Sequence, residues 1–384
     1  MKKKLGDVFE IGSGGTPSKT HPEYYGGDIP WVKTGDLKSE YLYEVEDFIT
    51  EEGLNNSSAK MYESDTVLIA MYGATIGATS ILNFPACTNQ ACAAFKKSEE
   101  ILPEYLYFFL RSKKEKFVND GVGGTQPNIS AGYLKKVQIE VRSLDEQSEI
   151  INVLDKVNRI IDERTKELAA LDDLIKARFV EMFGDINVNP LGWDTYNLDE
   201  CFEIASSKRI LKSEWKTEGI PFLRVRDVVQ LVTTGKIDND FFVSEEFYAT
   251  LKDSDGIPKQ GDVLVSATST LGKCYIVKSG ERFYFKDADV LRFRSKKNIN
   301  PVFFVEQMKT QYIEKQIART LGVTTVAHFT IKAAKTINMR LPDIDLQNQF
   351  ADFVNQVNKS KVEIQQALEK TQLLFDSLMQ QYFG

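Results

Sequence analysis

The chain contains the stretch DEQSEIINVLDKVNRIIDERTKELAALDDLIKARFVEMFG at residues 145–184, where apolar residues recur in alternating steps of four and three. Residues 345–384, DLQNQFADFVNQVNKSKVEIQQALEKTQLLFDSLMQQYFG, repeat this pattern 200 positions later. A period of 3.5 residues over more than four heptads predicts two long helices that pair through a coiled-coil-like seam. The predicted seam residues are Ile150, Leu154, Val157, Ile161, Leu168, Leu171, Ile175, Phe350, Val354, Val357, Ile364, Leu368, Phe375 and Leu378.

The ends of both stretches also match. Each begins with an aspartate, Asp145 or Asp345, which we expect to cap the helix, and each ends in Phe-Gly. Glycine is the favoured residue just past a helix end. Thirty-eight helical residues at 1.5 Å each give a rod of roughly 57 Å.

The remainder of the chain reads as two copies of one α/β domain. Leu5–Ile11 matches Leu198–Ile204, Ile29–Val32 matches Ile220–Leu223, and the spacing between copies settles at 200 from Thr125 onward. The predicted fold is therefore two globular α/β domains separated by two long antiparallel helices, with an internal pseudo-two-fold repeat. The predicted segments are 1–143, 144–184, 185–342 and 343–384.

Local signals predict the elements within each copy. Pro103 and Pro301 are expected to open helices, and Ser130 and Thr330 to cap short ones. The predicted strands are Val67–Met71, Thr79–Leu82, Ala91–Phe95, Val263–Ser266, Cys274–Val277 and the alternating run Arg282–Arg294.

Composition narrows the class of protein. With 384 residues, of which 42% are hydrophobic, the chain can form substantial cores, and it has no apolar run long enough for a membrane span. We expect a cytoplasmic protein whose four cysteines are buried thiols, because they lack the C-x-x-C spacing of a metal site. The net charge is −7, but residues 185–343 alone carry a net +2, so charge neither favours nor excludes DNA.

No catalytic site stands out in the sequence. The Gly-rich segments 12–15 and 121–124 are not followed by the residues of a phosphate-binding or dinucleotide-binding loop, and we interpret them as turns. His21 and His328 are too isolated in sequence to indicate a triad or a metal site.

Polar and basic loops in equivalent places of both copies indicate recognition instead. Amide side chains can pair bidentately with adenine, and arginine with guanine or phosphate. Arg292 and Arg294 also alternate on one predicted strand face. The candidate DNA-binding residues are Thr16, Ser18, Lys19, Lys33, Thr34, Tyr72, Thr75, Gln126, Asn128, Lys208, Arg209, Lys212, Arg224, Arg226, Ser269, Lys273, Thr324, Thr325 and His328.

The segments GGTPSK, IPWVKTGDL, GTQPNIS and the helix ending RFVEMFGD together resemble the DNA specificity (S) subunits of Type I restriction-modification systems. The resemblance covers the whole chain. It implies that each α/β domain is a target recognition domain for half of a split DNA site, and that the helices separate the domains and dock two methyltransferase (M) subunits. It also implies that this chain holds no cofactor: S-adenosylmethionine would bind to the M subunits, and ATP and Mg²⁺ to restriction (R) subunits.

The sequence departs from the family pattern at two places. The family's Pro-Pro-Leu-x-x-Gln segment is replaced by 141–147 and 341–347, and the second copy has VTTVAHFT, residues 323–330, in place of GTQPNIS. Two other readings stay open at this point. A self-contained DNA methyltransferase would need a cofactor loop and a catalytic Pro-Pro motif, and a coiled-coil adaptor would bind protein ligands.

Overall fold

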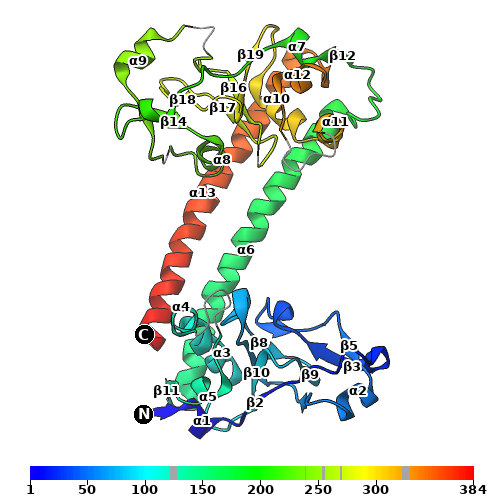
Figure 1. Ribbon diagram of the computed structural model, residues 1–384, viewed down its shortest axis with the longest axis vertical. Helices are drawn as coiled ribbons and strands as arrows, with labels where there is room; N and C mark the ends of the chain where they lie inside the picture. The colour runs from blue at the N-terminus through cyan, green and yellow to red at the C-terminus, as the bar shows by residue number, and fades with distance from the viewer. Residues whose placement is uncertain (122–127, 238, 253–255, 269, 322–327) are drawn as a thin grey trace. The chain divides into compact units, whose positions relative to one another are not determined.

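The structure is a computed structural model, which describes residues 1–121, 128–237, 239–252, 256–268, 270–321 and 328–384 (Figure 1). The chain forms two compact units, one of Met1–Thr165 with Gln365–Gly384 and one of Lys166–Ile364. Each unit contains one α/β domain and part of each long helix.

The first unit is built on a five-stranded sheet in the order β2-β10-β7-β8-β4. Alternate residues of β7 face two cores, because successive side chains of a strand point to opposite faces. Val67 and Ile69 pack with helix α3 (Pro103–Ser112), while Leu68 and Ala70 belong to a separate cluster. The strands are β2 (Ile11–Ser13), β10 (Cys92–Phe95), β7 (Val67–Ala70), β8 (Thr79–Leu82) and β4 (Tyr41–Leu42).

Two smaller sheets complete the strands of this unit. The orders are β5-β3-β9-β6 and β1-β11. Their strands are β1 (Lys2–Lys4), β3 (Tyr25–Val32), β5 (Phe48–Ile49), β6 (Met61–Tyr62), β9 (Ala86–Thr88) and β11 (Gln138–Glu140). The helices and 3-10 turns are α1 (Leu5–Val8), η1 (Pro22–Tyr24), η2 (Thr34–Asp36), α2 (Glu51–Asn55), η3 (Gly73–Thr75), α3 (Pro103–Ser112), α4 (Lys114–Asp120) and α5 (Ala131–Leu134).

The second unit repeats this plan. Its sheets run β13-β19-β16-β17, β15-β14-β18 and β12-β20, which match the order of the first unit, except that the described residues form no counterpart of β4 or β6. The strands are β12 (Asp194–Asn197), β13 (Phe202–Ala205), β14 (Ile220–Leu223), β15 (Phe242–Val243), β16 (Val263–Ser266), β17 (Cys274–Ile276), β18 (Tyr284–Phe285), β19 (Val290–Ser295) and β20 (Asn338–Leu341). The helices are α7 (Leu198–Cys201), η4 (Lys212–Glu214), α8 (Val225–Thr234), α9 (Glu245–Thr250), α10 (Pro301–Met308), α11 (Gln311–Leu321) and α12 (Ile331–Lys335).

The predicted caps of the short helices, Ser130 and Thr330, and most of the predicted strands are confirmed. The Ser130 hydroxyl accepts a hydrogen bond from the Tyr133 amide, and Thr330 accepts one from Ala333, both at 3.1 Å. The prediction of one strand over Arg282–Arg294 is wrong. The run splits into β18 and β19, and Ala288 between them has a left-handed backbone with φ of 62°.

The long helices are α6 (Leu144–Phe183) and α13 (Ile344–Phe383), each of 40 residues. The prediction that Asp145 and Asp345 cap them is wrong, because both lie inside the first turn. At α6 the Ser143 hydroxyl instead accepts from the Glu146 amide at 3.3 Å, and the Ser143 amide donates to the Glu146 carboxylate at 3.0 Å. Gly184 follows α6 with a left-handed φ of 71°, as a helix end favours.

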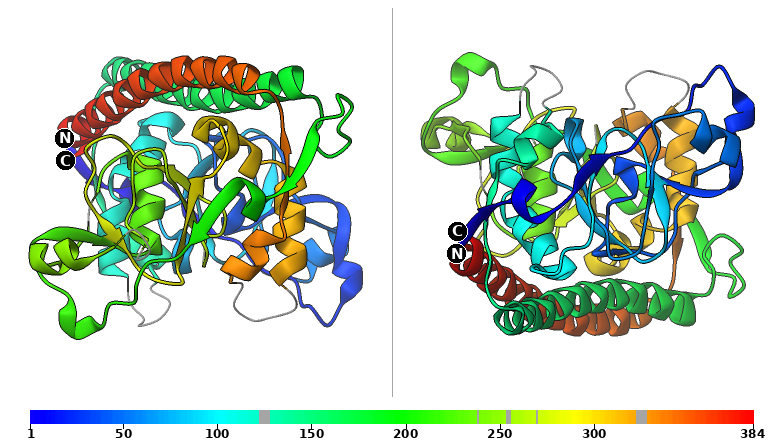
Figure 2. Two further views of the ribbon diagram at one scale, coloured as in Figure 1. Left: turned by 90° about the horizontal axis from the view of Figure 1, so that it is seen from above. Right: turned by 90° about the horizontal axis from the view of Figure 1, so that it is seen from below.

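Within each unit the two helices run antiparallel. In the second unit Phe183 packs against Phe350 with ring centroids 5.4 Å apart, and Lys361 pairs with Asp172 at 2.5 Å. In the first unit the last part of α13 lies beside the first part of α6 (Figures 1 and 2), and near the middle of the two helices Arg164 donates to the Ala367 carbonyl and the Thr371 hydroxyl.

Burial of the predicted seam is greatest next to the domains. The buried seam residues are Ile150, Leu154, Val157, Ile175, Phe350, Val354, Val357 and Phe375, and the half-buried ones are Ile161, Leu168, Leu171, Ile364, Leu368 and Leu378. Phe179, Phe183, Met379 and Phe383 are buried too, although the heptad omits them. They follow a spacing of four because the helix ends pack on their own domain as well as on the other helix.

Candidate nucleic-acid interface

In the first unit, two loops that contain candidate residues meet a third loop at one end of the central sheet. β2 and β7 both end there, and β10, antiparallel to both, begins there. Backbone hydrogen bonds join the loops: the Gly15 amide donates to the Thr88 carbonyl at 2.9 Å, and the Met71 amide to the Ala91 carbonyl at 2.8 Å. The sheet therefore brings residues 14–20, 71–75 and 88–91 together.

Gly14 and Gly15 allow the first loop to lie against the third. A Cβ atom on Gly14 would be 1.9 Å from the Thr88 carbonyl oxygen, which is closer than any side chain tolerates. The buried Trp31 indole donates to the Gly15 carbonyl at 3.0 Å and fixes the loop from the other side. Beyond this anchor Thr16 donates to the Gln90 amide oxygen.

The remaining candidates of the first unit differ in how free they are. Ser18 and Lys19 are exposed, and Thr34 is half-buried on η2. Lys33 is engaged within the protein, because its ammonium lies 2.5 Å from Asp47 and its backbone amide donates to Asp36 at 2.7 Å.

Tyr72 and Asn128 are brought together from distant parts of the sequence. They form an isolated antiparallel β-bridge, and the neighbouring Ile129 amide donates to the Met71 carbonyl at 3.0 Å. The Tyr72 side chain is 43% exposed, and Thr75 donates to its carbonyl at 3.0 Å. Gln126 lies outside the described residues.

The second unit gathers its candidates in the same way. The Ala267 amide donates to the Asp289 carbonyl at 2.8 Å, and the Phe329 amide, next to His328, donates to the Ala267 carbonyl at 2.8 Å. The Ala288 amide donates to the Ser206 hydroxyl at 3.0 Å. These contacts gather residues 206–209, 267–268, 288–289 and 328 at the equivalent end of the second sheet. Lys208 and Arg209 are exposed there.

Three further candidates lie around this group. Lys273 closes the hairpin between β16 and β17, where its carbonyl accepts from the Ser266 amide at 2.9 Å. Lys212 is exposed on η4, farther along the chain. Ser269, Thr324 and Thr325 lie outside the described residues.

Several arginines of the second unit serve its internal structure. Arg224 and Arg226 both bind the buried Asp227, at 3.1 and 3.0 Å, and Arg226 also binds Asp240 at 3.0 Å. The Arg224 guanidinium stacks on Phe241 with its centre 4.3 Å from the ring. Both side chains would have to leave these partners to bind DNA.

The expectation that Arg292 and Arg294 form an exposed basic face is wrong. The Arg292 side chain is 0% exposed and donates to Glu203 at 2.6 Å. Arg294 donates to Asp262 at 3.0 and 2.8 Å. These arginines share a face, as predicted, but neighbouring chain segments cover it and place two carboxylates against it.

Sequence reasoning also missed two residues at these loop groups. Gln90 contacts Thr16, and Lys286 lies in the corresponding loop of the second unit, where its amide donates to the Leu223 carbonyl at 2.8 Å as the Asn89 amide does to the Val32 carbonyl at 2.9 Å. Both residues come shortly before the strand that pairs with two neighbours in the central sheet, which is β10 in the first unit and β19 in the second. Aligning the two copies there would have identified them. Lys286 pairs with Asp289 at 2.6 Å, whereas Gln90 is exposed.

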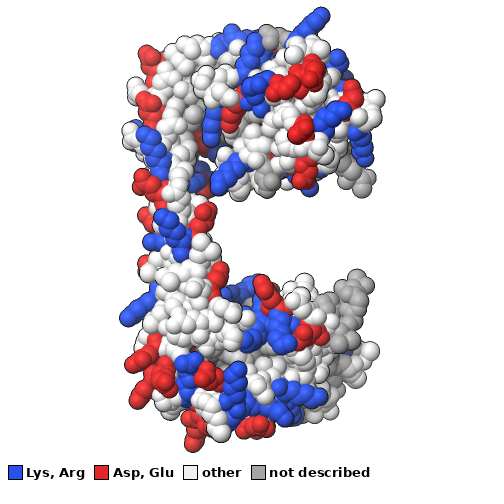
Figure 3. Space-filling view, turned by 90° about the vertical axis from the view of Figure 1, so that its left-hand side faces the viewer, with Lys and Arg blue, Asp and Glu red and all other residues white. Residues whose placement is uncertain are grey.

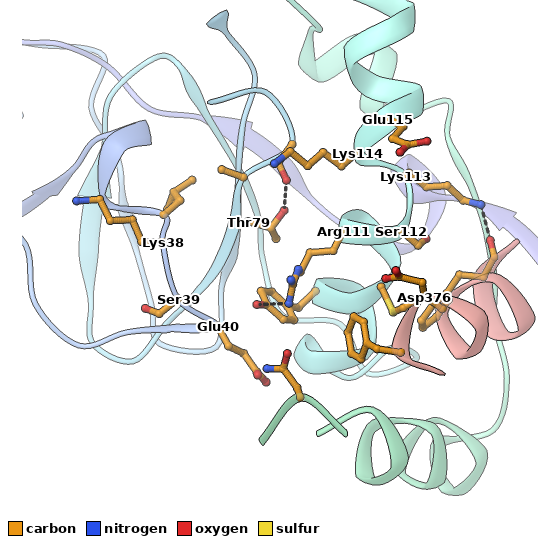
Figure 4. A pocket seen from close by; sticks show the side chains of 18 of the residues that line it. Lys38, Ser39, Glu40, Thr79, Arg111, Ser112, Lys113, Lys114, Glu115 and Asp376 are labelled. Atoms are coloured by element: carbon orange, nitrogen blue, oxygen red, sulfur yellow. Dashed lines mark hydrogen bonds between the residues drawn. The ribbon is translucent and has the colours of Figure 1, made fainter. Parts of the chain in front are cut away.

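A cavity of the first unit lies elsewhere. It has a volume of about 1070 Å³ and is enclosed by the segment before β4, the end of α3, and parts of α6 and α13 (Figure 4). Arg111, at its centre, donates to the Tyr107 hydroxyl at 3.0 Å, and Lys113 donates to the Phe383 carbonyl. The predicted DNA-binding residues do not line it.

One acidic group in this cavity is strongly perturbed. Burial, followed by the nearby carboxylates of Asp155, Glu104 and Asp162, raises the pKa of the Glu40 carboxyl to about 7, and Arg111 opposes this effect. Glu40 is the half-buried residue that precedes β4.

Charge on the surface is mixed. On the face drawn in Figure 3, basic and acidic side chains alternate over both units, without a broad area of one sign. Among the described residues, no three His, Cys, Asp or Glu side chains gather as metal ligands would, and no helix is both long and apolar enough to cross a membrane. Cys87, Cys92 and Cys201 are buried free thiols, as expected, and Cys274 is half-buried.

Known proteins resemble this chain in both sequence and structure. It is 29% identical over 265 residues to the Type I restriction enzyme MjaIX specificity subunit of Methanocaldococcus jannaschii, covering 63% of this chain and 60% of that protein. It is also 29% identical over 172 residues to the EcoR124I/EcoR124II specificity subunit of Escherichia coli, covering 43% of each. The chain thus matches less than two thirds of the length of each of these relatives.

Two solved structures share the fold across the full chain. The Type I restriction-modification S subunit of M. genitalium aligns with 100% of this chain and 96% of its own at 18% identity and a TM-score of 0.58. A chain from a study of assembly and conformational transition in the Type I system aligns with 100% and 97% at 16% identity and a TM-score of 0.60.

The family match covers nearly the whole sequence. The model described as Type I restriction modification DNA specificity domain matches residues 1–172 and 190–373, so that both copies are included. The chain belongs to the family of Type I restriction-modification DNA specificity domains.

Proposed function

We propose that this chain is the non-catalytic specificity subunit of a Type I restriction-modification complex, and that each α/β domain reads one half of a bipartite DNA site. The observation that carries the proposal is the repetition of one loop group. Both units hold polar loops together at the same end of an equivalent sheet, in a chain of this family. Two copies of one recognition domain suit a DNA target that consists of two separate half-sequences.

The two loop groups differ in their chemistry. The first offers hydroxyl, amide and phenol groups from Thr16, Gln90, Tyr72 and Asn128, which suit base edges. The second offers exposed cations such as Lys208 and Arg209, which suit guanine or phosphate. We therefore expect two different half-sequences, each discriminated by about 1–3 kcal/mol per bidentate contact.

The long helices would set the spacing between the half-sequences. Two unbroken helices of 40 residues, about 60 Å at 1.5 Å per residue, are stiff compared with a loop of the same length. A DNA site would then need both half-sequences and the correct number of base pairs between them.

The catalytic steps would belong to partner subunits. S-adenosylmethionine would bind two M subunits that methylate adenine, and ATP with Mg²⁺ would bind R subunits. α6 carries apolar side chains in heptad positions away from the seam: Val153, Ile160 and Leu174 are 37%, 40% and 45% exposed. A partner helix that packs on this stripe would remove it from water, so we place an M-subunit contact there.

Mapping methylated adenines across the genome tests the proposal. With the gene intact, we expect adenine methylation at one sequence made of two fixed half-sequences and a fixed spacer. This methylation should disappear when the gene is deleted. Restoring the gene should restore the same pattern. An unchanged methylation map would exclude the role and would favour the adaptor alternative.

Salt dependence tests how the DNA is held. Because the chain has a net charge of −7 and a mixed surface, we expect the chain alone to bind DNA weakly and the complex with M subunits to bind tightly. Affinity should fall steeply as salt rises. A gel shift at low and high salt measures both, and tight binding by the isolated chain would contradict the expectation.

A further inference from the structure

Each long helix carries one completely buried glutamine in its first turn. Gln147 and Gln347 are both 0% exposed, and each is the fourth residue of its helix. A buried amide is costly unless its polar atoms are hydrogen-bonded. The hydrogen-bond partners of these two amides therefore indicate why a glutamine is needed at each position.

Gln147 joins three segments of the first unit. Its side-chain oxygen accepts from the Leu102 amide at 2.9 Å, and its nitrogen donates to the carbonyls of Glu100 at 2.8 Å and Arg142 at 3.0 Å. Residues 100–102 lead into α3, which covers the sheet of the recognition domain, and Arg142 lies just before α6. One side chain thus ties the start of the long helix to the domain.

Gln347 makes the corresponding connection in the second unit. It accepts from the Asn300 amide at 3.0 Å and donates to the Pro342 carbonyl at 2.7 Å. Leu102 and Asn300 differ, as do Arg142 and Pro342, but the bonds are to main-chain atoms: every residue supplies the carbonyl, and every residue except proline supplies the amide. The glutamine is the same in both copies while its surroundings have changed.

We propose that Gln147 and Gln347 are positioning residues for spacer selection, because they fix the direction in which each long helix leaves its recognition domain. This inference rests on the proposed bipartite reading. Without the bond network, the domain would pivot at the helix start and tolerate neighbouring spacer lengths. The loops that read the half-sequences would keep their own contacts.

The two junctions are not equally reinforced. In the second unit, the buried Gln307 binds both the amide and the carbonyl of Arg340, at 3.0 and 2.8 Å. Gln316 does the same for Asn338, at 2.8 and 3.0 Å. Both targets lie on β20, the strand before α13. In the first unit, the corresponding strand β11 receives a side-chain bond at 3.3 Å from Tyr105 to the Glu140 carbonyl. Loss of Gln147 should therefore matter more than loss of Gln347.

The test uses the complex of the full chain with M subunits and duplexes that carry both half-sequences with spacers of n−1, n and n+1 base pairs. The readout is methyl transfer to adenine. We expect the preference for n to fall about tenfold in Gln147→Leu, which corresponds to ~1.4 kcal/mol, and to fall less in Gln347→Leu. The preferred half-sequences should not change in either variant.

Two further variants separate positioning from general loss of stability. Gln147→Met keeps the length of the side chain without its hydrogen bonds, and it should relax spacer choice even if Gln147→Leu does not fold. Phe117→Leu removes buried volume from the same unit at a site outside the junction. At matched melting temperature it should leave the spacer preference at the wild-type value.

The outcomes are distinguishable. If the wild-type complex methylates no two-word site, the proposed function fails. If the wild type discriminates spacers and Gln147→Met discriminates them equally well, the positioning role is wrong. Equal relaxation by Phe117→Leu would also overturn it, since loss of stability would then explain the effect.

Discussion

At the scale of residues, the candidate interface depends on close approach of backbone that side chains would prevent. Gly14 lies so near Thr88 that a methyl group has no space, whereas at Gly35, within η2, no atom lies within 4 Å of the position that a Cβ atom would take. The same substitution should therefore disturb the backbone at Gly14 and leave it undisturbed at Gly35.

We expect Gly14→Ala to push residues 14–20 away from residues 88–90 and to weaken recognition of one half-sequence by about tenfold or more, comparable to losing a bidentate base contact. Gly35→Ala should bind DNA like the wild type. Competition binding with duplexes altered in either half-sequence measures this in the assembled complex. Equal behaviour of the two variants would contradict the importance of this loop contact.

Glu40 predicts a pH dependence of stability. Its pKa, about 7 in the folded protein against an ordinary 4.5, means that the folded state retains a proton which the unfolded state has lost. The stabilising contribution is complete below about pH 4.5 and disappears as pH rises through about 7. Between pH 5 and 8, Glu40→Gln should flatten the fall in melting temperature seen in the wild type.

The exposed Glu115, in the same cavity, offers the matched control. Glu115→Gln should leave the pH profile of the melting temperature unchanged. If Glu40→Gln kept the full wild-type slope, another group would be responsible for it.

Residue types could be predicted from sequence more readily than their partners. The roles of Ser130 and Thr330 as caps depend on neighbours three residues away, so local spacing was sufficient. The engagement of Lys33 by Asp47, and of Arg294 by Asp262, depends on which segments the fold places together. Basic residues that appear available for DNA in the sequence are thus partly committed to internal ion pairs.

At the scale of elements, periodicity predicted both long helices almost to their ends. It could not predict how they start, because a capping residue competes with its neighbours by geometry that sequence does not reveal. Nor did it predict that Phe179 and Phe183 would be buried, since they contact Phe303 of their own domain and not only the other helix. The division of Arg282–Arg294 into two strands depends on the left-handed Ala288, which is unusual for that residue type.

Helix length predicts the spacer. Four residues inserted into α6 near Thr165 lengthen it by about 6 Å, and DNA rises about 3.4 Å per base pair, so we expect a shift of roughly one to two base pairs. Methylation mapping should find both half-sequences unchanged.

The control is a four-residue insertion at residues 187–189, in the turn beyond the helix. It should leave the spacer as it was. A change in either half-sequence after the α6 insertion would contradict the role of the helix as a spacer.

At the scale of the whole molecule, duplication predicts modularity. Replacing residues 1–143 with the corresponding domain of another family member should change one half-sequence and leave the other half and the spacer intact. Replacing residues 185–342 should change only the other half. Methylation mapping of both chimeras provides reciprocal controls, and a change in both halves from a single exchange would contradict independent reading.

The architecture was the most predictable feature of this protein because the same sequence pattern occurs in both copies. Two copies supply independent signals for each element, and the matching sheet orders agree with them. The bases that are read could not be predicted in the same way. Specificity depends on angles of a few loop side chains, and these vary between the copies even where the framework is shared.

The main-chain bonding of Gln147 and Gln347 has an evolutionary consequence. An attachment through main-chain atoms places little restriction on the side chains of the domain that it holds. The recognition loops can diverge, or an entire domain can be exchanged by recombination, and the start of the long helix can still form the same hydrogen bonds to the new domain.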